Sequence, residues 1–196
     1  MAGKRILILQ GHPDPIGGHL CHALAEAYAA GAAAGGHKVQ TVTPAELSFP
    51  LLRSQAEWRH GTLPPTLVQA QQAIRWADHL VLVFPLWLGD MPALVKGFLE
   101  QVARPGFAFK ADEATPFAAK NLGGRSARVV VTMGMPALVY RWYFRAHSLK
   151  SLERNVLGFV GFDPVRATLV GSVDQLNPAG VARWRRRLQQ LGHDAD

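Results

Sequence analysis

The chain contains a single cysteine, Cys21, and no long apolar run among its 196 residues. A lone thiol cannot form an internal disulfide, so a disulfide-stapled secreted scaffold is excluded and a cytoplasmic location is expected. The longest apolar run, around Leu80 to Leu88, is interrupted by Pro85 and is far too short to cross a bilayer, so no membrane insertion is expected. Near the start of the chain, Lys4 and Arg5 precede only four apolar residues, which predicts no signal peptide.

Acidic residues are scarce relative to basic ones, with 14 Asp and Glu against 21 Lys and Arg and a formal charge of +7. Nucleic-acid binding would explain this balance if the basic residues clustered on one surface. The densest cluster lies within residues 183–187, inside a segment whose apolar residues recur at helical spacing: Val181, Trp184, Leu188 and Leu191. The arginines therefore fall on the opposite face of the expected helix, and we favour a solvated surface over a nucleic-acid site. Such a surface would still attract anionic nicotinamide dinucleotides.

The length and the apolar content of 48% predict one folded domain spanning residues 1–196. Five apolar stretches are expected strands: Arg5 to Gln10, Val39 to Val42, His79 to Phe84, Arg128 to Val131 and Val165 to Val170. Helices are expected between and after them, over His19 to Ala34, Thr66 to Trp76, Pro92 to Val102, Ser148 to Phe159 and from Asn177-Pro178 onward.

This alternation predicts an α/β fold in which helices on both faces cover a five-stranded parallel sheet. The alternation alone leaves the strand order open. Two stretches are not expected to be regular, Pro44 to Pro65 and Arg104 to Gly124. The second is a long irregular excursion, which is more often functional than structural in a compact domain.

The segment that follows the third expected strand is the most informative. Pro85 should end the strand because proline cannot donate a ladder hydrogen bond, Asp90 should cap the next helix and Pro92 should lie in its first turn. Three apolar residues lie between, at the carboxyl end of the strand: Leu86, Trp87 and Leu88. Open α/β sheets bind ligands at such ends, and an apolar surface beside free backbone N–H groups suits a flavin ring. An aromatic beside a buried strand is also often core, which is the competing interpretation of Trp87.

Two further loops are candidate site walls. The loop Gly11 to His19 carries Gly17 and Gly18 before a helix, which permits close approach of a phosphate to the backbone. It is neither a Walker A loop nor a dinucleotide fingerprint, so an ordinary turn remains an equal alternative. The other loop, after the fourth expected strand, comprises Thr132, Met133, Gly134 and Met135.

These segments together resemble the NAD(P)H:quinone oxidoreductase family of flavodoxin-like flavoproteins. The match is carried by F-P-L-W-L-G-D-M-P-A-L-V-K-G-F from Phe84, by P-G-F-A-F from Pro105, by G-H-P from Gly11 and by T-M-G-M from Thr132. The resemblance implies a flavodoxin-like fold with strand order 2-1-3-4-5. It implies an enzyme that moves a hydride from NADH or NADPH through flavin N5 to a quinone or similar acceptor by a ping-pong sequence. The implied cofactor is FMN, with FAD as the alternative, and the implied assembly is a homodimer.

The resemblance also implies roles for individual residues. His12 lies beside the flavin phosphate, which the loop with Gly17, Gly18 and His19 would hold. Because relatives often have a serine and an aromatic where this chain has the two glycines, binding here would depend on backbone N–H groups and His19. The flavin ring would lie between two walls, formed by Pro85, Leu86, Trp87 and Leu88 and by Thr132, Met133, Gly134 and Met135.

Tyr140 and His147 follow Gly134 at nearly the spacing of a Tyr and a His in related enzymes. They would stabilise charge at flavin N1 and O2 or at a quinone oxygen. The competing interpretation is that Tyr140 to Phe144 is an aromatic surface that packs against a partner. The homodimer surface is predicted to include Phe107, Phe109, Trp142 and Tyr143.

Four alternatives concern other classes of function. His19 and His22, with Cys21 between them, would lie near one helical face, but an i, i+3 pair without a second ligand cluster is a poor zinc signal, so no metal is expected. Cys21 is interpreted as a small buried residue and not as a nucleophile. A flavodoxin-type electron carrier would bind FMN without turning over a substrate, although such carriers are usually acidic. A regulatory flavoprotein subunit of a potassium-efflux system would explain the basic surface.

Overall fold

The computed structural model describes residues 3–110 and 120–196. Its sheet has the order β2-β1-β3-β4-β5, and every neighbouring pair is parallel. The strands are β1 (Arg5–Gln10), β2 (Lys38–Val42), β3 (His79–Pro85), β4 (Arg125–Thr132) and β5 (Phe162–Val170). The five-stranded parallel sheet and its flavodoxin-like order are thus confirmed.

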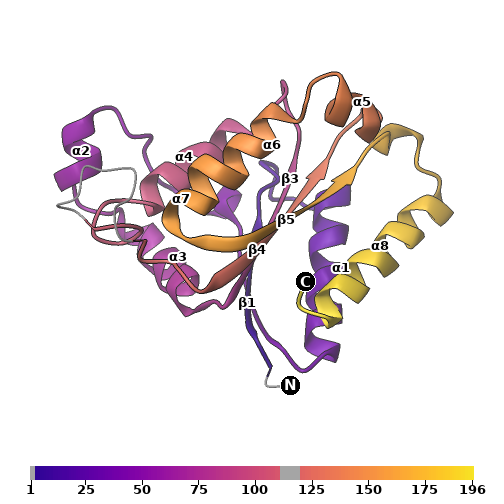
Figure 1. Ribbon diagram of the computed structural model, residues 1–196, viewed down its shortest axis with the longest axis horizontal. Coiled ribbons are helices and arrows are strands. Elements are labelled where there is room, and N and C mark those ends of the chain that lie inside the picture. The colour runs from indigo at the N-terminus through magenta and orange to yellow at the C-terminus, as the bar shows by residue number, and fades with distance from the viewer. Residues whose placement is uncertain (1–2, 111–119) are drawn as a thin grey trace.

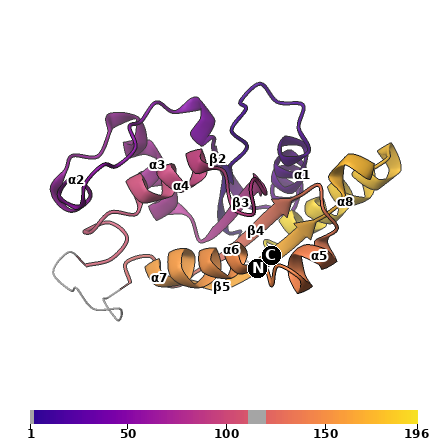
Figure 2. The ribbon, with the colours of Figure 1, turned by 90° about the horizontal axis from the view of Figure 1, so that it is seen from above.

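Helices cover both faces of this sheet (Figures 1 and 2). One face carries α1 (Leu20–Ala34) and α8 (Pro178–His193). The other carries α3 (Pro65–Trp76), α4 (Ala93–Val102) and a long helical segment made of α6 (His147–Ser151), the π-helical η2 (Leu152–Leu157) and α7 (Gly158–Val160). Shorter elements are η1 (Pro44–Glu46), α2 (Gln55–His60), α5 (Ala137–Trp142) and η3 (Val173–Gln175). No helix within residues 3–110 and 120–196 is both long and apolar enough to cross a membrane.

The central strands β1 and β3 and most of β4 are apolar because both of their faces are buried, whereas the edge strands β2 and β5 are partly exposed. Side chains alternate across a strand, so Ile6 and Ile8 pack under α1 and α8 while Leu7 and Leu9 pack under α3 and α4. The exposed arginines of α8 lie on the side away from this core, whereas Leu188 is buried. The prediction that these arginines lie on the exposed face of the helix is therefore confirmed.

The contact between α1 and α8 depends on two glycines. A Cβ atom at Gly31 would lie 1.8 Å from the carbonyl oxygen of Gln189, and one at Gly192 would lie 2.1 Å from the carbonyl oxygen of Tyr28. The two helix backbones thus approach more closely than any side chain would allow. This close approach fixes how α1 lies on the sheet, and so where the loop that leads into α1 begins.

Two details of the β3–α4 connection differ from expectation. Strand β3 includes Pro85 as its last residue, which pairs with Thr132 of β4. The hydrogen bonding continues one residue further, because the Leu86 amide donates to the Thr132 carbonyl at 2.7 Å. Asp90 does not cap α4, since Pro92 holds the N-cap position and the Asp90 carboxylate accepts from the Met91 amide at 2.7 Å. The aspartate is used inside the turn and not at the helix end.

The two segments expected to be irregular have partly regular structure. Between residues 44 and 65 the chain forms η1 and α2, and Ser54 caps α2 by accepting from the Glu57 amide at 3.1 Å. Of the excursion from Arg104 to Gly124, residues 111–119 lie outside the described residues. Its first part folds back on itself, with the Gly106 amide donating to the Phe109 carbonyl at 2.8 Å.

Candidate functional site

The carboxyl ends of β1, β3 and β4 adjoin at one edge of the sheet. The Gly11 amide donates to the Val83 carbonyl at 2.7 Å, so the chain leaving β1 passes directly over β3. A Cβ at Gly11 would lie 2.9 Å from that oxygen, which explains why a glycine stands there. The three loops predicted to form the site are therefore neighbours in space.

The loop after β1 is held by its own side chains. The Gln10 side-chain oxygen accepts from the His12 amide at 2.7 Å, and His12 Nδ1 accepts from the Asp14 amide at 3.1 Å. One oxygen of Asp14 accepts from the Ile16 amide at 2.9 Å, and the other lies 2.9 Å from His19 Nε2. Gln10 is buried at the end of the apolar strand RILILQ. A polar residue at the end of an apolar run is the sequence signal that would have identified Gln10 as a residue of this loop.

Backbone donors gather where this loop enters α1. Gly17 and Gly18 have φ angles of 91° and 77°, a region that favours glycine, and no atom lies within 4 Å of where their Cβ atoms would be. Within the described residues the amides of Gly17, Gly18 and His19 have no hydrogen-bond partner. His19 is the N-cap of α1 but its side chain does not cap the helix. An open concavity of free N–H groups at a helix N-terminus suits an anion.

Three imidazole rings cluster where this loop enters α1. The rings of His12 and His19 stack at 3.9 Å between centroids, and the ring of His22 lies 5.3 Å from His12. Burial, with the neighbouring His19, lowers the pKa of His12, whereas the hydrogen bond from His19 lowers the pKa of the Asp14 carboxyl. Both ring nitrogens of His22 are buried without a partner among the described residues. In that part of the chain no group of three His, Cys, Asp or Glu side chains could hold a metal ion.

The turn after β3 presents Trp87 to the loop after β1. The amides and carbonyls of Trp87 and Asp90 pair reciprocally at 2.9 and 3.0 Å, and Leu88 and Gly89 between them have φ angles of 47° and 84°. This is a tight two-residue reversal with positive φ at both central residues. The Trp87 side chain is 51% exposed and its ring meets the His12 ring edge-on at 6.1 Å. Trp87 is therefore not a core residue.

The loop after β4 divides into a buried and an open part. Thr132 is buried with its hydroxyl 3.1 Å from Cys21 Sγ, and Met133 is buried with its amide bound to the Val170 carbonyl. Gly134 and Met135 lie nearer the surface. The carboxylate of Asp174 lies over Gly134, 2.9 Å from where a Cβ would be, and the sequence analysis missed this charge. Burial raises the pKa of Cys21 to about 11, as expected for an inert thiol.

The two predicted catalytic residues lie in different surroundings. Tyr140 is only 2% exposed, and its hydroxyl lies 2.7 Å from Ser148 Oγ and accepts from the Leu149 amide at 3.2 Å. His147 is exposed at the start of α6. Tyr140 therefore ties the corner between α5 and α6 together, while His147 is exposed at the surface.

The predicted dimer surface is partly wrong, because Phe107 and Phe109 are buried within their own chain, at 8% and 9% exposure. The excursion folds over the end of α4, so these rings pack inward: the Arg75 guanidinium lies 5.1 Å from the Phe107 ring and Trp58 lies 5.7 Å from Phe109. Trp142 and Tyr143 are exposed as expected.

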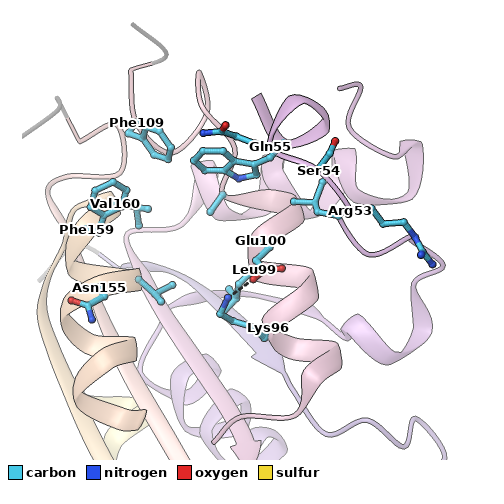
Figure 3. A pocket seen from close by; sticks show the side chains of 14 residues that line it. Arg53, Ser54, Gln55, Lys96, Leu99, Glu100, Phe109, Asn155, Phe159 and Val160 are labelled. Carbon is cyan, nitrogen blue, oxygen red and sulfur yellow. Dashed lines mark hydrogen bonds and ion pairs between the residues drawn. The ribbon is translucent and has the colours of Figure 1, made fainter. Parts of the chain in front are cut away.

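A larger concavity lies elsewhere, between α2, α4 and α7 (Figure 3). It has a volume of about 600 Å³ and aromatic walls made by Trp58, Phe109 and Phe159, beside the Lys96–Glu100 ion pair. No predicted site residue lines it. The chemistry suggested by the β1, β3 and β4 loops therefore does not coincide with this cavity. We base the site on the loops because free donors, stacked imidazoles and an exposed tryptophan meet there.

Comparison with known proteins agrees with this architecture. A family model described as flavodoxin-like fold matches residues 4–191. NAD(P)H dehydrogenase (quinone) 1 of Rattus norvegicus is 25% identical over 153 residues, which are 74% of this chain and 55% of that protein. The chain thus spans little more than half the length of this relative. The FMN-dependent NADH:quinone oxidoreductase of Erythrobacter litoralis is 30% identical over 142 residues, which are 71% of this chain and 67% of that protein.

Solved structures show the same fold. An NAD(P)H:quinone oxidoreductase from Methanothermobacter marburgensis superposes with a TM-score of 0.82 at 22% identity, covering 99% of this chain and 98% of that one. An FMN-dependent NADH-azoreductase from Bacillus anthracis in complex with FMN has a TM-score of 0.76 at 15% identity, covering 98% of each chain. The resemblance seen in the sequence is confirmed, and the chain belongs to the flavodoxin-like fold family.

Proposed function

We propose that this protein is an FMN-dependent NAD(P)H:quinone oxidoreductase. The observation that carries the proposal is the meeting of two features at one sheet edge. Free amides of Gly17, Gly18 and His19 suit a phosphate monoester, and the half-exposed Trp87 beside His12 suits the edge of a flat ring. Relatives that carry quinone oxidoreductase and FMN in their names support the choice.

The residues present fit this cofactor. Gln10 Nε2 and both ring nitrogens of His22 are buried beside the loop without partners in the described residues, as expected where a bound polar group completes the hydrogen bonding. The space around Gly17 and Gly18 is open. His19 Nε2 lies 2.9 Å from Asp14 Oδ2, so this carboxylate oxygen is engaged within the loop. Backbone donors would thus take the place of the side-chain hydroxyl that the resemblance leads one to expect in this loop.

When bound, the flavin supplies the hydride acceptor and donor, and the protein supplies position and charge. Trp87 and the turn from Trp87 to Asp90 would flank one edge of the ring, and Gly134 and Met135 would approach it from β4. We assign His147 to hold or donate a proton near flavin N1 and O2 or at the quinone oxygen. Tyr140 would support the stabilisation of that charge indirectly, because its hydroxyl holds the corner that carries His147. One edge would receive NADH or NADPH and the quinone in turn, which gives ping-pong kinetics.

FMN is proposed over FAD because the relatives whose names state a flavin name FMN. A homodimer and a cytoplasmic location belong to the same proposal. An electron carrier, or a regulatory subunit of a potassium-efflux system, would share flavin binding but would not need an accessible proton donor such as His147.

Titration of the purified chain with FMN, riboflavin and FAD tests the proposal. Binding should quench FMN fluorescence with a dissociation constant of micromolar order or below, which corresponds to a binding free energy on the order of −8 kcal/mol. Riboflavin should bind more weakly because it lacks the phosphate. The loaded protein should oxidise NADH or NADPH with menadione as acceptor. Binding without turnover would favour a carrier or a regulatory subunit, and no binding of any flavin would contradict the proposal.

A further inference from the structure

Buried side-chain nitrogens without a hydrogen-bond partner gather beside the loop after β1. The described residues contain four such nitrogens, and three of them belong to two residues at this place, Gln10 Nε2 and both ring nitrogens of His22. Gln10 is only 4% exposed. A buried donor without a partner costs free energy, so native proteins keep few of them, and one at a candidate site indicates a bond that a ligand completes.

The orientation of the Gln10 amide follows from its one hydrogen bond. Its oxygen accepts from the His12 backbone amide at 2.7 Å, and a backbone N–H can be paired only with an acceptor. The NH₂ group of Gln10 is therefore the end that is left without a partner in the described part of the chain. This group carries two N–H donors and no acceptor, so it suits an anionic oxygen.

The side chain of Gln10 lies on the face of the sheet that α1 covers. Side chains alternate along β1, and Ile6 and Ile8 pack on that face. At the same end of the sheet, Thr132 Oγ1 of β4 lies 3.1 Å from Cys21 Sγ in the first turn of α1. The free NH₂ group is thus beneath the entry to α1, where the free backbone amides of the loop also gather.

His22 borders the same place from α1. Its ring lies 5.3 Å from the His12 ring between centroids. Gly18, His19 and His22 line one concavity of about 370 Å³, so the backbone donors and this ring adjoin one open space. Residues 6–37 contain no Lys or Arg. An anion at this loop would therefore be held by N–H donors and the N-terminus of α1, without a lysine or arginine from the loop or the helix.

We propose that Gln10 is a phosphate-binding residue, whose buried NH₂ group donates to a phosphate oxygen of FMN from beneath the loop. This role rests on the proposed function. It explains how the loop can hold a phosphate with Gly17 and Gly18 where the resemblance leads one to expect a side-chain hydroxyl, because a buried amide at the end of β1 supplies the missing donor. The two ends of the Gln10 side chain then have separate tasks: the oxygen holds the loop and the nitrogen binds the ligand.

The test compares the affinities of the full chain for FMN and for riboflavin, which lacks the phosphate, by fluorescence titration at about pH 8, where an ordinary carboxyl is ionised. Gln10→Glu keeps the size of the side chain and an oxygen for the His12 amide, but it replaces the free donor by a carboxylate oxygen. We expect Gln10→Glu to weaken FMN binding by about tenfold to a hundredfold and to change riboflavin binding by no more than about twofold.

Inorganic phosphate is a second probe, which needs no flavin. It should raise the thermal midpoint of the wild type and leave that of Gln10→Glu unchanged. Gln72→Glu makes the same substitution at an exposed position of α3 and should respond to FMN, riboflavin and phosphate as the wild type does. Circular dichroism checks that both variants are folded.

The outcomes separate this role from the proposed function. If Gln10→Glu binds FMN as well as the wild type does, or loses FMN and riboflavin affinity equally, Gln10 only holds the loop and the proposed role is wrong, while the protein remains a flavoprotein. If the wild type binds no flavin, the proposed function is wrong. The thermal response to inorganic phosphate then decides the role of Gln10, because an equal response of the wild type and Gln10→Glu would overturn it.

Discussion

Trp87 is half-exposed although it lies only two residues beyond a strand whose every residue is buried. Its backbone is fixed by reciprocal hydrogen bonds with Asp90, so the ring is held in place without being part of the core. Trp87→Ala should therefore weaken FMN binding by about 1 to 3 kcal/mol without changing the thermal midpoint of the free protein. Fluorescence titration and circular dichroism measure the two quantities.

Trp87→Phe keeps an aromatic surface at this position and should retain most of the affinity. Loss of the folded signal in Trp87→Ala would instead assign Trp87 to the core. Unchanged affinity would remove the turn after β3 from the site.

His79 determines an acid sensitivity that is separate from the site. It is buried, its Nδ1 lies 2.7 Å from Ser126 Oγ, and burial lowers its pKa from 6.5 to about 3. The folded state therefore holds this imidazole neutral while the unfolded state protonates it below pH 6.5. The contribution of His79 to the free energy of unfolding is therefore fully present above that pH. It falls by about 1.4 kcal/mol per pH unit between roughly pH 6 and pH 3.

His79→Gln should flatten this slope, because glutamine does not titrate and can still bond to Ser126. Urea unfolding of both proteins between pH 7 and pH 4 compares the slopes. A variant whose stability falls as steeply as that of the wild type would show that other groups cause the acid sensitivity.

At the scale of elements, the corner between α5 and α6 connects packing to the proposed chemistry. Arg145 and Ala146 have positive φ angles, 53° and 48°, and the Tyr140 hydroxyl bridges Ser148 and the Leu149 amide directly after them. His147→Ala should slow a flavin half-reaction about 100-fold, since it removes a proton donor. Tyr140→Phe should slow the same half-reaction less and lower the free energy of unfolding by about 1 kcal/mol.

Stopped-flow reduction by NADH and reoxidation by menadione separate the half-reactions. Tyr143→Phe is the control, because that hydroxyl is exposed and has no partner within the described residues. Wild-type rates in both His147→Ala and Tyr140→Phe would make this corner a packing feature only.

The same elements show what the sequence can and cannot predict. Apolar runs located all five strands, but β4 begins at Arg125, three residues early, because that side chain binds the carbonyls of Ala77 and Arg75 from distant segments. The tight turn at Leu88 was missed because a leucine gives no signal of positive φ. Between Tyr140 and Phe144 the sequence does not distinguish a buried aromatic residue from an exposed one. Only the tertiary structure shows that Tyr140 is buried while the other aromatic residues of the run are exposed.

For the whole molecule, the alternation of strands and helices predicted the layers, and the strand order came from the resemblance. The three loops were correctly predicted to lie side by side, because parallel strands end at one edge, while their role as a binding site stays a prediction. The Asp174 carboxylate over Gly134 and the cavity of Figure 3 were not predictable, since each depends on residues far apart in the sequence.

The layer made by α1 and α8 gives a prediction for the molecule as a whole. Gly31→Ala would place a Cβ 1.8 Å from the Gln189 carbonyl oxygen, which is backbone and cannot move aside without separating the helices. We expect a loss of about 1 to 3 kcal/mol or more in the free energy of unfolding. Gly180→Ala in α8 is the matched control, because its Cβ would meet the flexible Leu176 side chain at 3.2 Å and helix propensity favours alanine by about 1 kcal/mol.

Urea unfolding measures both variants, and FMN titration of the folded Gly31→Ala protein measures the consequence for the site. Since α1 begins directly after the loop of Gly17, Gly18 and His19, a displaced helix should move those amides and weaken FMN binding. Gly180→Ala should leave FMN affinity unchanged. If the two variants are equally stable and bind FMN equally, the close approach of α1 and α8 does not position the phosphate loop.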